Sequence, residues 1–238
     1  MKQNLSIEQL DAIAMVRPDV ARFLDRLLVQ TYDDFIEILY QDLDRAIAKL
    51  EEDPLIREDD GEDRLTAEIL SMLSQHYETA SHDEKIGGHA DMVVKHPKGF
   101  MWIGEAKIHK DYAYLEQGFK QLTTRYLPGT PGADQGALVI YIRVADSASV
   151  MKQWQARLAS LGLDGFGCRR CAVREDLAFY SQHKHDRTGR IATVRSMAVV
   201  LYCNPQDKKV HARDIQSEAG RAVQSVARKA KTRRPRIT

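Results

Sequence analysis

The sequence predicts an α/β protein in which a mixed β-sheet is flanked by helices and preceded by a helical N-terminal region. Three observations support this fold class. Apolar residues recur every three or four positions over residues 6–50, as on one face of a helix. Apolar and polar residues alternate over 85–96 and 100–109, as in strands. Helices and strands do not alternate strictly along the chain, which argues against a doubly wound nucleotide-binding fold.

The predicted elements follow one another through short connections. Residues 6–50 form helices, and a further helix begins at Glu62, after the acidic, proline-containing segment 51–61 that is the best candidate for a linker. A loop at 97–99, which contains proline and glycine, joins the first two strands. The later elements are expected in the order helix, strand, helix, strand, strand, at 111–126, 136–143, 147–161, 177–183 and 191–202.

The composition is that of a folded protein. The 238 residues are 43% hydrophobic and 29% charged, a balance that supports a buried core and excludes global disorder. No apolar run approaches the roughly 20 residues that a membrane-spanning helix needs. The first residues lack the apolar run of a secretion signal, and three cysteines are too few for a disulfide framework. We therefore expect a cytoplasmic protein.

Charge is distributed unequally, although the net formal charge is only +1. Residues 1–64 contain 17 acidic and 8 basic residues, so they carry −9 and the remainder carries +10. The segment 221–236, which includes Arg233 and Arg234, has seven basic residues and no acidic residue. The positive charge of the residues after 64 favours binding of a polyanion such as DNA, with Arg233 and Arg234 contacting it. We expect three regions, namely an acidic helical region at 1–54, an α/β domain at 55–210 and a basic helix or tail at 211–238.

The long helix of the acidic region carries an apolar stripe at Phe35, Ile38, Leu39 and Ile47. This stripe needs burial, either on the α/β domain of the same chain or on a sister chain. The second alternative predicts a homo-oligomer, in particular a dimer that forms through the N-terminal helices.

The loop at 97–99 defines the pairing of the two strands beside it. In an antiparallel hairpin with this loop, residues equidistant from Lys98 lie opposite each other, so Asp91 faces Glu105 and His89 faces Lys107. The strand period of two places Lys107 on the same face as Glu105. Like charges set opposite each other destabilise a sheet, and a divalent cation neutralises them. Because Mg²⁺ commonly uses only one or two carboxylates, Asp91 and Glu105 form a candidate metal site.

Asp91, thirteen further residues and then Glu105-Ala106-Lys107 resemble the motif of the PD-(D/E)XK nuclease superfamily, which has the restriction-endonuclease-like fold. The resemblance covers roughly residues 60–145. It implies a restriction-endonuclease-like sheet and a phosphodiesterase that depends on Mg²⁺ or Mn²⁺. Asp91, Glu105 and the carbonyl of Ala106 would hold the metal, and Lys107 would lie beside the attacking water. The residue before Asp91 is Ala90, where the family motif has proline.

The helices on either side of the hairpin supply further candidates. An acidic residue on the preceding helix matches a wider feature of this fold, and Glu62 is favoured over Glu68 because it shares the apolar stripe that faces the sheet. Glu62 would support a second ion or the water shell of the first. On the following helix, Gln121 would orient water or phosphate and Arg125 would bind phosphate; plain solvent exposure is the alternative for both.

His109, the last residue of the second predicted strand, and Lys110, directly after it, are further candidates for contacting nucleic acid. His109 shares the face of Glu105 and Lys107 by the strand period, and capping of the carboxylate cluster is its alternative role.

The cysteines suggest a second kind of metal site. Cys168-Arg-Arg-Cys171 has the spacing of half a structural zinc site, which Cys203, His183 and His185 could complete. The sequence has no second Cys-x-x-Cys pair, and His183 ends a predicted strand. We therefore favour reduced cysteines in or near a turn.

These inferences predict a Mg²⁺-dependent endonuclease that hydrolyses phosphodiester bonds, with DNA as the expected substrate and RNA as the alternative. Restriction, phage defence and repair all use this fold, and analogy favours defence or restriction. A catalytically silent nucleic-acid-binding or assembly module on the same fold is the second interpretation. The third is an effector whose nuclease is switched on when the acidic helices assemble with a partner.

Overall fold

The computed structural model describes residues 6–77, 79–82 and 84–206. The helices before the sheet are α1 (Ile7–Val16), α2 (Pro18–Leu27), α3 (Tyr32–Glu51), the 3-10 turn η1 (Leu55–Arg57) and α4 (Glu62–Leu73). The later helices are α5 (Tyr112–Lys120), its π-helical continuation η2 (Gln121–Tyr126) and α6 (Ser147–Ala159). The hydroxyls of Ser6 and Thr31 accept backbone hydrogen bonds at the starts of α1 and α3, which defines where these helices begin.

One mixed sheet of six strands has the order β3-β4-β5-β8-β7-β6. Its strands are β3 (Met92–Lys95), β4 (Met101–Ile108), β5 (Gln135–Ile142), β6 (Gly167–Arg170), β7 (Ala178–Lys184) and β8 (Ile191–Val200). β4, β5 and β8 are parallel, and the other strands run antiparallel to their neighbours. N-terminal helices followed by a mixed sheet with flanking helices confirm the predicted α/β class.

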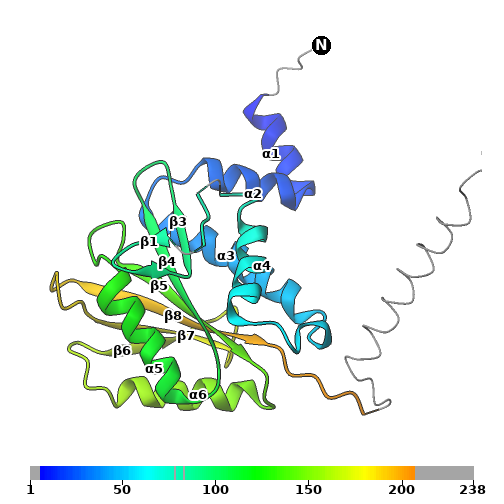
Figure 1. Ribbon diagram of the computed structural model, residues 1–238. Coiled ribbons are helices and arrows are strands. Elements are labelled where there is room, and N and C mark those ends of the chain that lie inside the picture. The colour runs from blue at the N-terminus through cyan, green and yellow to red at the C-terminus, as the bar shows by residue number, and fades with distance from the viewer. Residues whose placement is uncertain (1–5, 78, 83, 207–238) are drawn as a thin grey trace, which may run out of the picture.

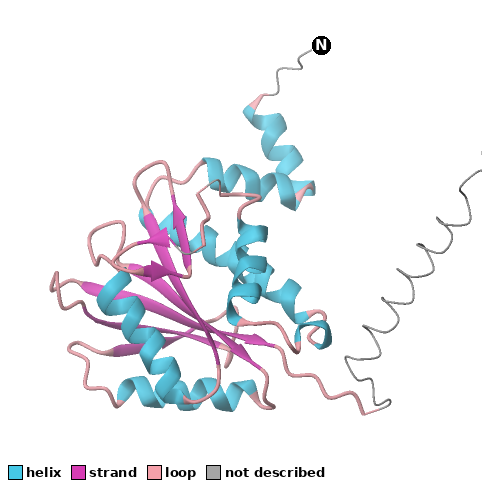
Figure 2. Ribbon diagram, viewed as in Figure 1, coloured by secondary structure: helices cyan, strands magenta, loops and turns pink. Residues whose placement is uncertain are grey.

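The sheet lies between two helical layers (Figures 1 and 2). α3 and α4 cover one face, and α5 with α6 covers the other. Side chains of β4 alternate between the layers, since Trp102 and Ala106 pack with α3 and α4 while Ile103 packs with α5 and α6. Glu105 and Lys107 have the parity of Ile103, so they lie on the face that α5 covers.

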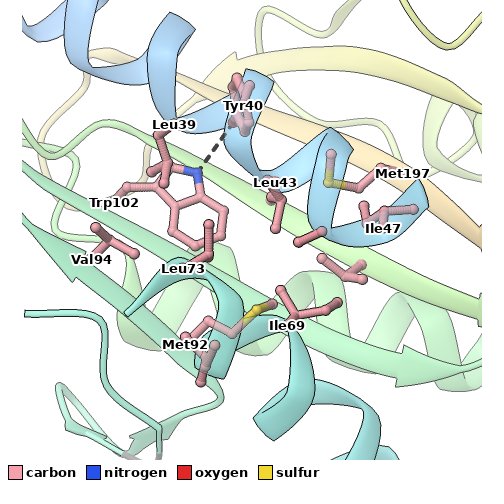
Figure 3. Packing of buried hydrophobic residues seen from close by; sticks show 14 of the residues in the cluster. Leu39, Tyr40, Leu43, Ile47, Ile69, Leu73, Met92, Val94, Trp102 and Met197 are labelled. Carbon is pink, nitrogen blue, oxygen red and sulfur yellow. Dashed lines mark hydrogen bonds between the residues drawn. The ribbon is translucent and has the colours of Figure 1, made fainter. Parts of the chain in front are cut away.

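Trp102 lies at the centre of the layer between α3, α4 and the sheet (Figure 3). Leu39 and Leu43 of α3 and Leu73 of α4 surround its indole ring, and its Nε1 donates to Tyr40 Oη at 3.4 Å. The apolar stripe of α3 is therefore buried on its own chain, which is the first of the two alternatives. Although α3 precedes the boundary predicted near residue 54, it shares one hydrophobic core with the sheet.

Helices α1 and α2 differ from α3 because none of their residues, all of which are described, is buried. Met15, Phe23 and Leu27 expose more than half of their surface. A buried carboxylate joins α2 to α3, since Asp42 accepts from Arg26 through both oxygens, at 2.6 and 2.8 Å. A dimer through the N-terminal helices stays a prediction, and the exposed apolar side chains of α1 and α2 are the surface available for it.

The first predicted strand, 85–96, is interrupted in the structure. Gly87 and Gly88 adopt positive φ angles of 64° and 154° and form a turn between β1 (Glu84–Lys85) and β2 (His89–Ala90), which pair as a separate ladder. The chain re-enters the main sheet at Met92, so Ala90 packs with α5 while Met92 packs with α3. The continuous alternation expected here was wrong, because two glycines separate the segment into two ladders.

The other elements agree closely with the sequence predictions, with two additions. Strand β6 follows no strong periodic pattern and was not predicted, and the helix predicted at 111–126 ends in η2. The predicted basic region at 211–238, with Arg233 and Arg234, lies outside the described residues. Within the described part of the chain, no helix combines the length and the apolar character needed to cross a membrane.

Candidate active site

The hairpin of β3 and β4 has the predicted register, but the pairing of His89 with Lys107 was wrong, because His89 pairs with Lys85 in the ladder of β1 and β2. Met92 pairs with Gly104 and Val94 with Trp102, and extending this pairing by one residue sets Asp91 opposite Glu105. Asp91 lies at the break between β2 and β3, where its Oδ2 accepts a hydrogen bond of 2.8 Å from the backbone N–H of Ala106. This bond holds the Asp91 carboxylate against β4, beside Glu105.

Lys107 lies at the centre of the cluster. Its Nζ is 2.6 Å from Glu105 Oε1 and 3.8 Å from Asp91 Oδ2. The same ammonium donates to the Ala106 carbonyl at 2.9 Å and to Glu62 Oε1 at 3.3 Å. Three carboxylates therefore surround one ammonium, and we refer to Glu62, Asp91, Glu105 and Lys107 as the acidic cluster.

Glu62 reaches the acidic cluster from the first turn of α4. Its Oε2 accepts from the backbone N–H of Ile108 at 2.7 Å, while its Oε1 faces Lys107. Glu68, two turns along the same helix, instead forms a bidentate ion pair with Arg57. The structure thus places Glu62 at the site and Glu68 away from it.

Helix α5 shapes the path of the Lys107 side chain. A Cβ atom on Gly118 would lie 2.7 Å from Lys107 Cγ, so only glycine leaves room for the lysine stem between α5 and the sheet. Gly118 was not predicted, because a glycine within a helix gives no sign of what packs against it.

A second residue that the sequence reading missed is Tyr114, in the first turn of α5. Its hydroxyl lies 3.4 Å from both carboxylate oxygens of Glu62, and the Nζ of Lys107 is 5.7 Å from its ring centroid. Tyr114 therefore limits the positions that Glu62 and Lys107 can adopt. Its position in the helix after the hairpin was the only signal available in the sequence.

Burial and like charges change the protonation of Glu105. The residue is 2% exposed, and burial followed by the negative charge of Asp91 raises its pKa from 4.5 to about 7. Burial would lower the pKa of Lys107, but Glu105 and Asp91 outweigh it, so the pKa of Lys107 lies above its usual value. Lys107 is accordingly charged at neutral pH, while Glu105 is present in both its protonated and its ionised form.

We expect Asp91→Asn to lower the pKa of Glu105 toward its usual value in metal-free protein, because the variant removes a neighbouring negative charge. The carboxyl resonance of Glu105, followed by NMR against pH in EDTA, measures this shift. Asp63→Asn is the matched control, since Asp63 is the exposed neighbour of Glu62 on α4. A pKa of Glu105 that is the same in Asp91→Asn and wild-type protein would contradict the proposed coupling.

The same pKa predicts a pH-dependent stability. The folded protein holds the Glu105 proton more tightly than the unfolded chain, so this group lowers the free energy of unfolding as pH rises from 4.5 to about 7. Glu105→Gln removes the titration. The free energy of unfolding of the variant, minus that of wild type, should therefore increase by about 1–3 kcal/mol as pH rises from 4.5 to about 7. Urea unfolding in EDTA measures both free energies. A relative stability independent of pH would contradict the raised pKa.

The donor set meets the chemical requirements of a hard divalent cation. Glu105 Oε2 is buried and has no hydrogen-bond partner among the described residues, and three carboxylates outnumber the one ammonium. Within the described residues, no group of three or more His, Cys, Asp or Glu side chains is arranged to hold a metal. The candidate ligands are therefore two carboxylates, Asp91 and Glu105, with the Ala106 carbonyl, and Mg²⁺ often binds through so few protein groups.

The remaining predicted site residues do not join the acidic cluster. Gln121 and Arg125 line an open depression of about 430 Å³ on the outer side of α5 and η2, and Gln121 Oε1 is buried with no partner in the described part of the chain. His109 packs against the Tyr112 ring at 5.3 Å, and burial lowers its pKa. Lys110 Nζ lies 4.8 Å from the centroid of the Tyr114 ring.

One contact connects Arg125 to the segment that carries Asp91. A Cβ atom on Gly87 would lie 2.2 Å from the carbonyl oxygen of Arg125, so the β1–β2 turn packs directly on η2. The backbone of Arg125 therefore contacts the turn that precedes β2 and Asp91, while the Arg125 side chain is exposed.

The cysteines and histidines considered for a zinc site do not come together, within the described residues, as a group that could hold a metal. Cys171 Sγ accepts from Arg195, and His185 Nε2 contacts the carbonyl of Leu127 at 3.0 Å. Cys168 and Cys203 are exposed, free thiols. Cys168 lies within β6 and Cys171 directly after it, so the turn expected around these cysteines begins only at Cys171.

The fold and this site define an α/β protein with a buried lysine among three carboxylates at the edge of a mixed sheet. Comparisons of the chain with protein-family models, with curated proteins and with solved structures found no match.

Proposed function

We propose that the protein is a metal-dependent phosphodiesterase of the restriction-endonuclease-like type, acting on DNA. The observation that carries this proposal is the meeting of Asp91, Glu105 and Lys107 at one point of the β3–β4 hairpin, with Glu62 added from α4. These residues come from segments as far apart as 62 and 107, and they present an excess of negative charge. A nucleic-acid-binding surface has no use for such a cluster unless a cation is bound there.

The residues have distinct roles in this proposal. Asp91, Glu105 and the Ala106 carbonyl would hold Mg²⁺ or Mn²⁺, which would polarise the phosphate and lower the pKa of a bound water. Lys107 orients the attacking water and offsets negative charge that develops on the phosphate. Glu62 and Tyr114 position the Lys107 ammonium, and Glu62 as a ligand of a second ion is the alternative. Gln121, Arg125, His109 and Lys110 line the approach of the polyanion.

Cleavage assays on defined substrates test the proposal. The full chain is incubated with linear duplex, supercoiled plasmid, single-stranded DNA and RNA, each with Mg²⁺, with Mn²⁺ and with EDTA. We expect cleavage of DNA that EDTA abolishes, with Lys107→Met as the inactive matched control. Absence of metal-dependent cleavage on all four substrates would overturn the proposal.

A specific observation favours a second candidate, a catalytically silent nucleic-acid-binding or assembly module. Lys107 already contacts Asp91, Glu105 and Glu62, so the acidic cluster is partly neutralised without a metal. Calorimetric titration with Mg²⁺ or Mn²⁺ separates the two candidates. The silent module predicts no metal binding, whereas the phosphodiesterase predicts binding that Glu105→Gln weakens.

The basic segment after residue 220 gives a prediction about binding. Deletion of residues 221–238 is expected to weaken binding to duplex DNA without abolishing cleavage at low salt, because seven positive charges are lost. Each lost phosphate contact reduces the slope of log K against log salt by about 0.9. Fluorescence anisotropy at several salt concentrations measures the slope, and an equal slope for both chains would show that this segment does not contact DNA.

A further inference from the structure

A cavity of about 470 Å³ lies beside α3, on the side of the sheet opposite the acidic cluster. Tyr40 and Asp44 of α3 line it, together with Tyr180 of β7 and Arg195 of β8. Cys171, directly after β6, lies at its wall. None of these residues takes part in the proposed phosphodiesterase.

The thiol of Cys171 contacts a buried cation. Arg195 is 1% exposed, and its Nη2 donates to Cys171 Sγ at 3.2 Å and to Asp44 Oδ2 at 2.9 Å. Burial would raise the pKa of the Cys171 thiol, but the backbone N–H of Arg174 and the guanidinium of Arg195 outweigh it and lower that pKa. A thiolate is the nucleophilic form of cysteine, and a neighbouring cation favours it.

Arg195 provides a second, independent observation. Its Nε and Nη1 are buried and have no hydrogen-bond partner among the described residues. The guanidinium lies 4.9 Å from the centroid of the Tyr40 ring and 5.6 Å from that of Tyr180, which hold it in place. Buried N–H groups without acceptors are costly, and an oxygen atom added to the Cys171 sulfur would bring a new acceptor to the side chain that carries these two donors.

The other cysteines lack this environment. Cys168 and Cys203 are exposed, and partial desolvation of the Cys168 thiol raises its pKa. No ion pair or hydrogen bond joins either thiol to an arginine in the described part of the chain. The three cysteines of the chain therefore differ in the charge beside their sulfur atoms.

We propose that Cys171 is a peroxide-reactive thiol, oxidised to sulfenic acid at the cavity wall, with Arg195 stabilising both the thiolate and the oxidised product. The sulfur attacks one oxygen of hydrogen peroxide, and the S–O bond forms as the O–O bond breaks. The sulfur loses two electrons to the leaving hydroxide, which takes a proton from solvent and becomes water. The product is a sulfenic acid, which thiols reduce back to cysteine.

The full chain is treated with hydrogen peroxide at pH 6 in the presence of dimedone, a probe of sulfenic acids, and the labelled peptides are quantified by mass spectrometry. We expect Cys171 to be labelled at least about tenfold faster than Cys168 and Cys203, although it is the buried one of the three. Labelling of Cys168 or Cys203 at the same rate or faster would overturn the proposal.

Two substitutions test the role of Arg195. Arg195→Gln is expected to slow labelling of Cys171 at least about tenfold. The matched control Arg169→Gln should leave it unchanged, because the Arg169 guanidinium lies 3.7 Å from the Tyr180 centroid and makes no hydrogen bond to Cys171 among the described residues. If Arg195→Gln does not fold, as judged by circular dichroism, Asp44→Asn takes its place. That variant keeps the guanidinium and removes its competing carboxylate, so labelling should be at least as fast as in wild type. Slower labelling in Asp44→Asn, or an unchanged rate in folded Arg195→Gln, would contradict the assignment.

Discussion

Substitution of Asp91 or Glu105 is expected to weaken metal binding and cleavage together, whereas substitution of Lys107 is expected to reduce cleavage alone. Asp91→Asn and Glu105→Gln each remove one of two candidate carboxylate ligands, so both activities should fall by at least roughly 10²-fold. Lys107→Met keeps the apolar stem that packs on Gly118 and removes the ammonium that contacts both acids. Its metal affinity should therefore equal or exceed that of wild type, while cleavage still falls by roughly 10²-fold.

Calorimetric titration of Mn²⁺ and cleavage assays on the same preparations measure both quantities. Asp63→Asn, the exposed neighbour of Glu62, is the control for the loss of a nearby carboxylate and should behave as wild type. A Lys107→Met protein that cleaves DNA at the wild-type rate would contradict the proposed role of Lys107 in cleavage. Wild-type protein that binds no divalent cation would refute the metal site as a whole.

The second large effect concerns α3. A chain without residues 1–51 is expected to lose its cooperative thermal transition, because α3 contributes eight buried hydrophobic residues to the core around Trp102. Burying one large apolar side chain is worth about 1.5–3 kcal/mol, so the loss exceeds the roughly 5–15 kcal/mol that stabilise a typical domain. Differential scanning calorimetry of both chains measures this.

Two leucine substitutions make the same test at single residues. Leu43→Ala, at a fully buried position of α3, should lower the free energy of unfolding by about 2–5 kcal/mol. The matched control Leu27→Ala, at a position of α2 that is 63% exposed, should change it by less than about 0.5 kcal/mol.

A truncated chain that still melts cooperatively would contradict the role of α3. A large loss in Leu27→Ala that depends on protein concentration would show that α2 is covered by a second copy of the chain.

The helix and strand positions were largely predictable because each depends on a local period. The apolar stripe of α3 and the alternation over β4 are visible in the sequence, and both elements lie where the pattern placed them. The pairing of Asp91 with Glu105 was equally local, since a three-residue loop between two strands leaves few possible registers. Strand β6 was missed because its residues show neither alternation nor an apolar run.

The sequence by itself determined the α/β class, the hairpin register and the identity of the two facing carboxylates. The apolar stripe of α4 favoured Glu62 over Glu68, but only the tertiary structure decided that Glu62 contacts Lys107 and that Glu68 pairs with Arg57. It also decided that Gly118 makes room for Lys107 and that Arg195 contacts Cys171. Contacts of this kind join residues far apart in the chain, and a periodic pattern carries no information about them, because it reports which face of an element is buried and not what is buried against it.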